Sequence, residues 1–206
     1  NGQGHTVSGL YCKCSDTYTG FFGYLNGGKI LNVGVENSYF YSNNDNAYVG
    51  GICGYVYSGD IKNCYNKGTI SAEISSNGSS GGICGSIYDS GNITNCFNTG
   101  SVNGSNVGAV CGYKGNGKIE NSFYLENCLG SCSNISCEEG KSTTSEKFAS
   151  GEIAYILQNG QSENIWGQKI GEENLPVLGG LKVYQNKAYS GCEGNKGDAV
   201  LSYSNT

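Results

Sequence analysis

The stretch GGICGYVYSGDIKNCYNKGTIS, residues 50–71, returns as GGICGSIYDSGNITNCFNTGSV at residues 81–102. Both copies hold their glycines, cysteines and asparagines at matching places, while the residues between them differ. An internal period of roughly 20 to 50 residues is typical of solenoids, propellers and other repeat arrays. This pair of copies therefore decides the fold class.

Two weaker copies flank the pair. Gly20-Phe21-Phe22-Gly23 precedes it and Ala109-Val110-Cys111-Gly112 follows it, so that the last glycines of the four copies are separated by 31, 31 and 27 residues. Each copy then carries a second element, which reads GKILNV, GDIKNCY, GNITNCF or GKIENSF. The sequence thus predicts about four coils.

The composition of the repeat favours strands over helices. No apolar spacing of 3.6 residues is present, and each glycine inside a helix would cost about 1 kcal/mol. Short β-forming segments instead alternate with Gly, Asn, Asp and Ser, which are turn residues. The prediction is an all-β, right-handed parallel β-helix, with the handedness taken from the general preference of parallel crossovers.

Two columns explain which residues the copies share. An aliphatic column would stack in the core and stabilise the fold by about 1.5–3 kcal/mol per side chain. An asparagine column, two residues further on, would allow a bend between strands and bond to the asparagines stacked above and below. The aliphatic column is Ile30, Ile61, Ile93 and Ile119. The proposed structural ladder is Asn32, Asn63, Asn95 and Asn121.

Charge and composition exclude some functions. The 206 residues contain 12 Lys, no Arg and 17 acidic residues, for a net charge of −5, which argues against a nucleic-acid partner. No apolar run approaches the ~20 residues that cross a bilayer, so no membrane insertion is expected from these residues. With no Met, the chain is interpreted as a piece of a longer protein.

Three regions are predicted along the chain. Residues 1–126 hold the solenoid, and residues 127–183 form a connector followed by a small helix-containing cap over the open end of the solenoid. In that cap Ser145 is expected to cap a helix that stops at Gly160, while Trp166, Pro176 and Leu178 pack beside it. Residues 184–206 are expected to be a peripheral strand or a linker.

The 11 cysteines cannot all pair within one chain, because their number is odd. Five of them fall into repeat columns, where stacked thiols would pack as small apolar groups. A looser set in the second half lacks the paired spacing of a zinc site, so a local disulfide or free thiols are the open readings. The column cysteines are Cys53, Cys84, Cys111, Cys64 and Cys96. The looser set is Cys128, Cys132 and Cys137, with Cys12, Cys14 or Cys192 as further partners.

No catalytic constellation stands out, so an enzyme is not expected and no metal or cofactor is predicted. His5 is the only histidine, and neither HExxH nor GxSxG occurs. Asp60 and Asp89 are the obvious acids for polysaccharide cleavage, but they do not share a column, and solvated turn carboxylates are the better reading.

Aromatic columns are more suggestive of binding. Tyr24, Tyr55 and Tyr113 follow the last glycine of their copies, with Ser86 breaking the row. If this row faces solvent, its rings offer a surface to a sugar or a protein. A second row is expected in the core. It consists of Tyr65, Phe97 and Phe123.

The pattern G-[hydrophobic]-[hydrophobic]-G followed by GDIKNCYN resembles the GLUG motif, which occurs in repeat regions of bacterial surface proteins, including adhesin-like proteins and immunoglobulin A metallopeptidases. The resemblance covers roughly residues 1–125, although Ala109 replaces the first motif glycine and two copies lack the Cys of NCY. It implies an extracellular, wall-associated, non-catalytic module that acts in adhesion or as a rigid stalk, with a host or surface glycan or a protein as ligand. A carbohydrate-binding or carbohydrate-cleaving β-helix module is the alternative.

Overall fold

The computed structural model describes residues 1–73, 77–135, 140–189 and 199–206, which form two compact units, Asn1–Thr143 and Thr144–Thr206. Each unit is described by itself. The first unit extends past residue 126, where the sequence places the end of the solenoid, because two later strands still pair with the coils.

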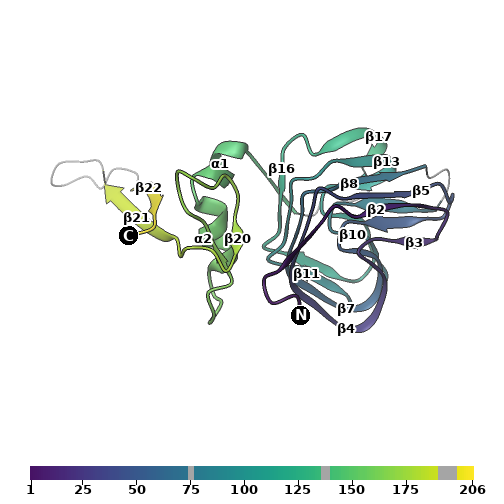
Figure 1. The fold of residues 1–206 in the computed structure, drawn as a ribbon, viewed down its shortest axis with the longest axis horizontal. Helices are drawn as coiled ribbons and strands as arrows, with labels where there is room; N and C mark the ends of the chain where they lie inside the picture. Colours follow the sequence, from purple (N-terminus) through teal and green to yellow (C-terminus); the bar gives the residue numbers. More distant parts are fainter. Residues whose placement is uncertain (74–76, 136–139, 190–198) are drawn as a thin grey trace. The chain divides into compact units, whose positions relative to one another are not determined.

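The first unit is a parallel β-solenoid of about four turns, which confirms the predicted fold class. Its described strands pair in parallel and fall into two sheets, as Figure 1 shows. The first sheet contains β1 (Thr6–Ser8), β4 (Phe22–Glu36), β7 (Cys53–Asn66), β10 (Cys84–Ile87), β11 (Asn92–Thr94), β12 (Phe97–Asn98), β14 (Cys111–Lys114), β15 (Lys118–Glu120), β16 (Phe123–Leu125) and β18 (Lys141–Thr143). The second contains β2 (Tyr11–Cys14), β3 (Tyr18–Thr19), β5 (Tyr39–Ser42), β6 (Tyr48–Gly50), β8 (Thr69–Ala72), β9 (Ser79–Gly81), β13 (Val102–Gly108) and β17 (Leu129–Ile135).

The register follows the repeat. Cys53, Cys84 and Cys111 are direct partners on adjacent strands, as are Ile61, Ile93 and Ile119. In the first two copies, β4 and β7 each continue without a break through the asparagine bend. In the third copy the same bend separates two strands, β11 and β12. Each bend carries an asparagine of the predicted column, with φ between 46° and 55°. Asn is one of the few residues besides Gly that adopts this left-handed conformation readily.

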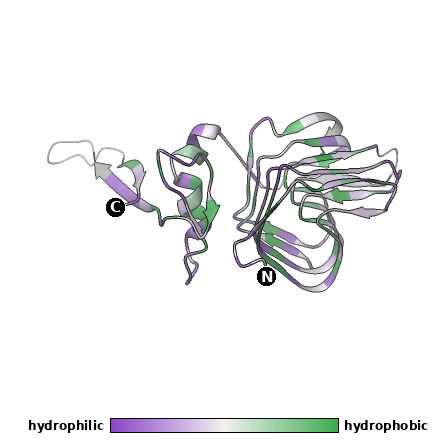
Figure 2. Ribbon diagram, in the orientation of Figure 1, coloured by the Kyte–Doolittle hydropathy of each residue, from purple (hydrophilic) through white to green (hydrophobic). Residues whose placement is uncertain are grey.

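The core of the solenoid is narrow and continuous. Ile61 and Ile93 are fully buried, Ile30 is nearly so, and Ile119 in the last coil is half-buried. Ile52 and Cys53 are adjacent in sequence, yet both are buried. Figure 2 shows apolar and polar segments alternating along the strands, as expected when every second side chain points inward.

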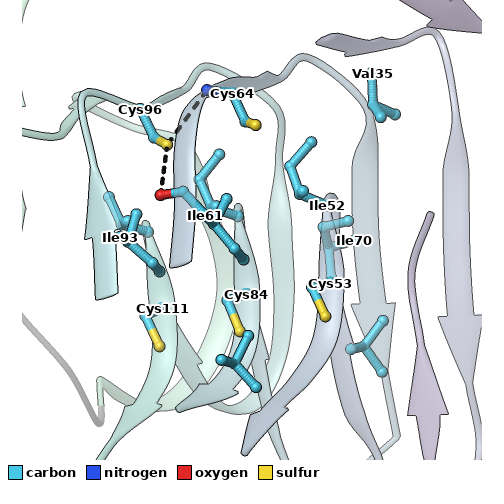
Figure 3. Packing of buried hydrophobic residues seen from close by; sticks show 14 of the residues in the cluster. Val35, Ile52, Cys53, Ile61, Cys64, Ile70, Cys84, Ile93, Cys96 and Cys111 are labelled. Carbon is cyan, nitrogen blue, oxygen red and sulfur yellow. Dashed lines mark hydrogen bonds between the residues drawn. The ribbon is translucent and has the colours of Figure 1, made fainter. Parts of the chain in front are cut away.

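Figure 3 shows the cysteine columns inside this core, with Cys53, Cys84 and Cys111 in one row and Cys64 beside Cys96. The Cys96 Sγ lies 3.4 Å from the backbone nitrogen of Cys64 and 3.8 Å from the carbonyl oxygen of Ile61. All five thiols are free and buried. They therefore pack as small apolar groups, as the sequence predicts.

The second unit corrects the predicted helix. In place of one helix from Ser145 to Gly160, there are two, α1 (Ser145–Ala149) and α2 (Glu152–Gln158). They are separated at Gly151, whose φ of 87° breaks the helix. The N-cap is Thr144 rather than Ser145, because the Thr144 side chain accepts a hydrogen bond from the backbone nitrogen of Lys147.

Apolar side chains of α1 and α2 form a small core with Trp166 of β19 (Trp166–Gly167), which pairs antiparallel with β20 (Val177–Leu178). Pro176 is buried and Leu178 half-buried. In place of a single peripheral strand or a linker, β21 (Tyr184–Tyr189) and β22 (Ala199–Ser204) pair antiparallel. None of the helices among the described residues is long and apolar enough to span a bilayer.

Candidate binding surface

The predicted tyrosine row lies on the outer side of β4, β7 and β14. Tyr24 and Tyr55 are register partners, and their rings stack with centroids 5.6 Å apart and planes 4° apart. Ser86 is the next partner in the row and is buried, and Tyr113 follows it. The structure thus brings Tyr24 and Tyr55 into contact and places Tyr113 two coils beyond Tyr55.

Four further tyrosines extend this row into a surface. Tyr18 of β3 lies 5.3 Å from Tyr24 and 5.1 Å from Tyr55, measured between ring centroids. Tyr48 packs edge-on against Tyr55 at 5.0 Å. Tyr88 stacks on both Tyr55 and Tyr57, at 6.3 and 5.6 Å. We call the whole set the tyrosine surface: Tyr18, Tyr24, Tyr48, Tyr55, Tyr57, Tyr88 and Tyr113.

Sequence reasoning missed these four residues, although two signals were present. Tyr57 and Tyr88 occupy matching places in the two best copies. Tyr18 and Tyr48 both lie shortly before the motif glycines, at distances that differ by one residue, and the structure pairs them. What the sequence lacks is the fold of the coil, which brings β3 and β6 of the second sheet beside β4 and β7 of the first.

Much of the tyrosine surface is open to solvent. The exposed fraction is 41% for Tyr18, 46% for Tyr24, 56% for Tyr88 and 51% for Tyr113. Exposed aromatic clusters of this kind are uncommon on soluble proteins and mark interaction sites. Tyrosine suits such sites because it supplies contact area at a low cost in conformational entropy and keeps a hydroxyl for hydrogen bonding.

The phenols of Tyr55 and Tyr48 are uncharged at neutral pH. Burial, together with the neighbouring phenols of Tyr48, Tyr18, Tyr88 and Tyr24, raises the pKa of Tyr55 to about 12. Burial is also the main cause of the raised pKa of Tyr48, with Tyr18 and Tyr113 adding to it. These two residues therefore add apolar area and neutral hydrogen-bonding groups to the surface rather than charge.

The ring orientations limit what can bind. Tyr24 and Tyr55 cover each other's faces, and Tyr57 and Tyr88 do the same at 21° between planes. Ring faces that are taken up by this stacking are not open to a sugar ring. A partner that offers its own side chains and backbone groups suits the remaining exposed area and the phenol hydroxyls better.

The asparagine column has a structural place at the bends. Asn63 Nδ2 donates to Asn32 Oδ1 at 3.0 Å, Asn121 Nδ2 donates to Asn95 Oδ1 at 2.6 Å, and Asn32 Nδ2 donates to Asn1 Oδ1 at 3.2 Å. Among the described residues, the buried Oδ1 of Asn63 has no hydrogen-bond partner. The column is therefore bonded in two separate segments.

A second asparagine pair escaped sequence reasoning. Asn66 and Asn98 are fully buried, and Asn66 Nδ2 donates to Asn98 Oδ1 at 3.0 Å. Each side chain also closes a turn on its own coil, where its Oδ1 accepts from the backbone nitrogen of Gly68 or Gly100. The sequence signal for this pair was the Asn-x-Gly pattern that the two best copies share, NKG at residues 66–68 and NTG at residues 98–100.

The remaining cysteines form no metal site among the residues that the structure describes. The Sγ atoms of Cys12 and Cys14 lie 3.8 Å apart on β2 and are free. Cys128 is buried and free, and burial raises the pKa of its thiol to about 11. Cys137 and Cys192 fall outside the described residues, as does the side chain of Cys132.

The candidate catalytic groups are dispersed. Asp60 Oδ2 lies 3.5 Å from the Lys29 amino group, and Asp60 Oδ1 accepts from Asn92 Nδ2 at 2.9 Å. Asp89 is exposed in the bend that follows β10. His5 lines an apolar cavity of about 410 Å³ beside Phe22 at the first coil.

The second aromatic row is buried, as predicted. Phe97 is fully buried, Tyr65 and Phe123 are each 4% exposed, and the rings of Tyr65 and Phe97 stack at 5.0 Å. The Tyr65 hydroxyl lies 2.7 Å from Thr6 Oγ1 and donates to Glu36 at 2.8 Å. This row belongs to the framework and not to a binding surface.

Comparison with known proteins agrees with this architecture. A crystal structure of a Bacteroides ovatus protein, proposed to be an immunoglobulin A1 protease, is similar over 86% of this chain and 76% of its own, with a TM-score of 0.58 and 22% sequence identity. This similarity concerns the fold. No curated protein matches the chain. Residues 45–71 match the family model of the GLUG motif, so this chain carries a GLUG motif within its β-solenoid.

Proposed function

We propose that this chain is a non-catalytic, extracellular module of a bacterial cell-surface protein that acts in adhesion and makes contact through the tyrosine surface. The observation that carries the proposal is the clustering of exposed tyrosines from successive coils, led by Tyr24, Tyr55 and Tyr88. The GLUG motif supports the cell-surface setting. The module would reach its place in the cell wall through other regions of its protein.

The mechanism is display on a rigid support. Tyr24 and Tyr55 project from strands whose neighbouring inward residues, such as Val56, are held in the core. Because backbone hydrogen bonds join the parallel strands of successive coils, the strands that carry the rings are held relative to one another before a partner arrives. Preorganisation of this kind lowers the entropic cost of binding.

The stacking of the rings on one another favours a protein partner. Hydroxyl and ring edges can contact the mixed polar and apolar groups of a protein surface, and tyrosine-rich antibody loops bind in this way. A neutral glycan is the other partner class. It would need open ring faces, and the stacks of Tyr24 on Tyr55 and of Tyr57 on Tyr88 leave few of them.

The positions of the acids support a non-catalytic role. Asp60 is already held by Lys29 and Asn92. Glu120 is the other carboxylate on the same face. It lies two coils away from Asp60 and two residues further along the strand, which corresponds to a backbone separation of about 11 Å. Glycosidases need two carboxyl groups that act on one bond, whereas the Asp60 carboxylate is already bound by a lysine and an amide.

The experiment is a binding screen of the purified chain on immobilised extracellular-matrix and serum proteins, run in parallel with a neutral-glycan array. The variant Tyr24→Ala/Tyr88→Ala removes two exposed rings, and Tyr184→Ala, an exposed tyrosine of the second unit, is the matched control. We expect saturable binding to a protein that the double variant loses and the control keeps. Equal binding by all three chains would contradict the proposal, and a neutral-glycan hit lost in the double variant would replace it with the carbohydrate-binding alternative.

A further inference from the structure

A second feature, a polar trough, lies on the outer face of the solenoid and shares no residue with the tyrosine surface. It has a volume of about 760 Å³ and crosses four coils. Its floor consists of two rows of register partners, and Ser90 and Asn116 border it. One row is Lys29, Asp60, Asn92 and Lys118. The other is Leu31, Lys62, Thr94 and Glu120.

The alternation of the strands explains why polar groups gather here. Ile30, Ile61 and Ile93 point into the core, so the residues on either side of them must point outward. Stacked coils are about 4.8 Å apart, and the floor therefore extends about 14 Å from the first coil to the fourth. A ligand that fills it must be elongated.

The charged groups in the trough differ in whether they form an ion pair. Lys29 and Asp60 neutralise each other across a 3.5 Å contact, and Asn92 also binds that carboxylate. Lys62 and Lys118 form no ion pair with any of the described residues. With three lysines and two acids, the trough is net positive on a chain whose net charge is −5.

The neutral groups narrow the ligand class. The hydroxyls of Ser90 and Thr94 and the amides of Asn92 and Asn116 can each donate and accept hydrogen bonds, which matches the hydroxyls of a sugar chain. No aromatic ring lines the trough, and its small surplus of charge is too low for a nucleic-acid backbone. A carboxylate spaced along a sugar polymer would meet the unpaired ammonium groups.

We propose that this trough binds an acidic, carboxylate-bearing polysaccharide laid across the coils. Lys62 and Lys118 would hold its carboxylates, while the hydroxyl and amide side chains between them would bind its hydroxyls. Glu120 would oppose binding, because it places a like charge beside the polymer. The site is independent of the tyrosine surface, so adhesion through the tyrosines can fail while this proposal stands.

The test measures binding of hyaluronate by isothermal titration calorimetry at low and physiological salt. Hyaluronate methyl ester, which has the same backbone without the charge, is the ligand control. Lys62→Ala/Lys118→Ala removes the two free cations, and Lys182→Ala/Lys187→Ala removes two exposed lysines of the second unit as the matched protein control. Far-UV circular dichroism and thermal midpoints verify that all variants are folded.

We expect hyaluronate to bind, its methyl ester to bind much more weakly, and the trough variant to lose about tenfold or more in affinity. The Lys182/Lys187 control and Tyr24→Ala/Tyr88→Ala should bind as the wild type does, and Glu120→Gln should bind more tightly. Higher salt should weaken binding. Absence of hyaluronate binding by the wild type, or equal losses in the trough and control variants, would overturn the proposal.

Discussion

Asn63 Nδ2 donates a 3.0 Å hydrogen bond to Asn32 Oδ1 in the preceding coil, while the Oδ1 of Asn63 is buried without a partner among the described residues. The column therefore depends less on a continuous chain of amide bonds than on what its members share, a backbone φ of 46–55°. Asparagine at these bends serves conformation first and hydrogen bonding second.

This relationship predicts how Asn63 variants rank. Asn63→Ala should lower the free energy of unfolding by about 1–3 kcal/mol, because it loses the amide bond and forces Ala into the left-handed region. Asn63→Gly loses the same bond but accepts the conformation, so it should be about 1 kcal/mol more stable than Asn63→Ala. Urea denaturation measures both. Equal losses of stability would mean that the missing amide hydrogen bond, and not the backbone φ, determines the cost of replacing Asn63.

The buried pair Asn66 and Asn98 should be more sensitive than the bend asparagines. Asn98→Ala removes the bond from Asn66 and leaves the carbonyl oxygen of Gly100 without its side-chain partner, while the backbone nitrogen of Gly100 keeps only its 3.3 Å bond to the Asn66 carbonyl oxygen. Each unsatisfied buried group costs about 1–3 kcal/mol, so the loss should exceed that of Asn121→Ala, which lies at the last bend. The thermal midpoints of the two variants, measured side by side, decide the order, and a reversed order would refute it.

Alkaline pH should destabilise the fold. Burial raises the pKa of the Cys53 thiol from 9.0 to about 12, and it also raises the pKa values of Cys84 and Cys96. Because these thiols ionise near pH 9 only when unfolded, the folded state binds more protons above that pH. Their contribution to stability is therefore complete below about pH 9 and is lost progressively as the pH rises toward about 12.

The measurement is the thermal midpoint between about pH 7 and pH 11, in the presence of a reductant. Cys53→Ala should show a shallower decline than the wild type, since it removes one of the titrating groups. The raised pKa of Tyr55 acts in the same direction and is unaffected by this variant. A midpoint that stays level through pH 11 would contradict the burial of neutral thiols.

Gly34 and Tyr65 should be energetically coupled. The Tyr65 ring covers the α-carbon of Gly34, and a Cβ at position 34 would collide with that ring. Gly34→Ala should therefore displace the ring and its bond to Glu36, and lower the free energy of unfolding. In Tyr65→Ala the space is open, so Gly34→Ala should cost much less. Additive losses in the double-mutant cycle would show that the two residues are independent.

The repeat made the framework predictable. Because Ile30, Ile61 and Ile93 must each stack on their own copy, the sequence alone reveals the column, the period and the parallel pairing. The Tyr65 row was predictable for the same reason. The break at Gly151 was less so, since a glycine can sit inside a helix at modest cost, and only its φ of 87° shows that the chain turns there.

The binding surfaces were only partly predictable. Tyr24 and Tyr55 share a column, so the repeat identifies them, but Tyr18 and Tyr48 reach the same surface from another sheet. Their approach depends on how tightly the coil turns between sheets, and no local pattern encodes that turn. The trough could not be predicted from the sequence for a similar reason. Its two rows of side chains form one net positive surface only when four coils are stacked.

The central claim is that the tyrosine surface makes the adhesive contact, and the most direct measurement is adhesion itself. Particles coated at equal density with the wild type, Tyr24→Ala/Tyr88→Ala or Tyr184→Ala would be counted on surfaces coated with the protein ligand found in the screen. We predict that the double variant loses most of the attached particles while the Tyr184→Ala control retains them. Equal attachment of all three would contradict the claim.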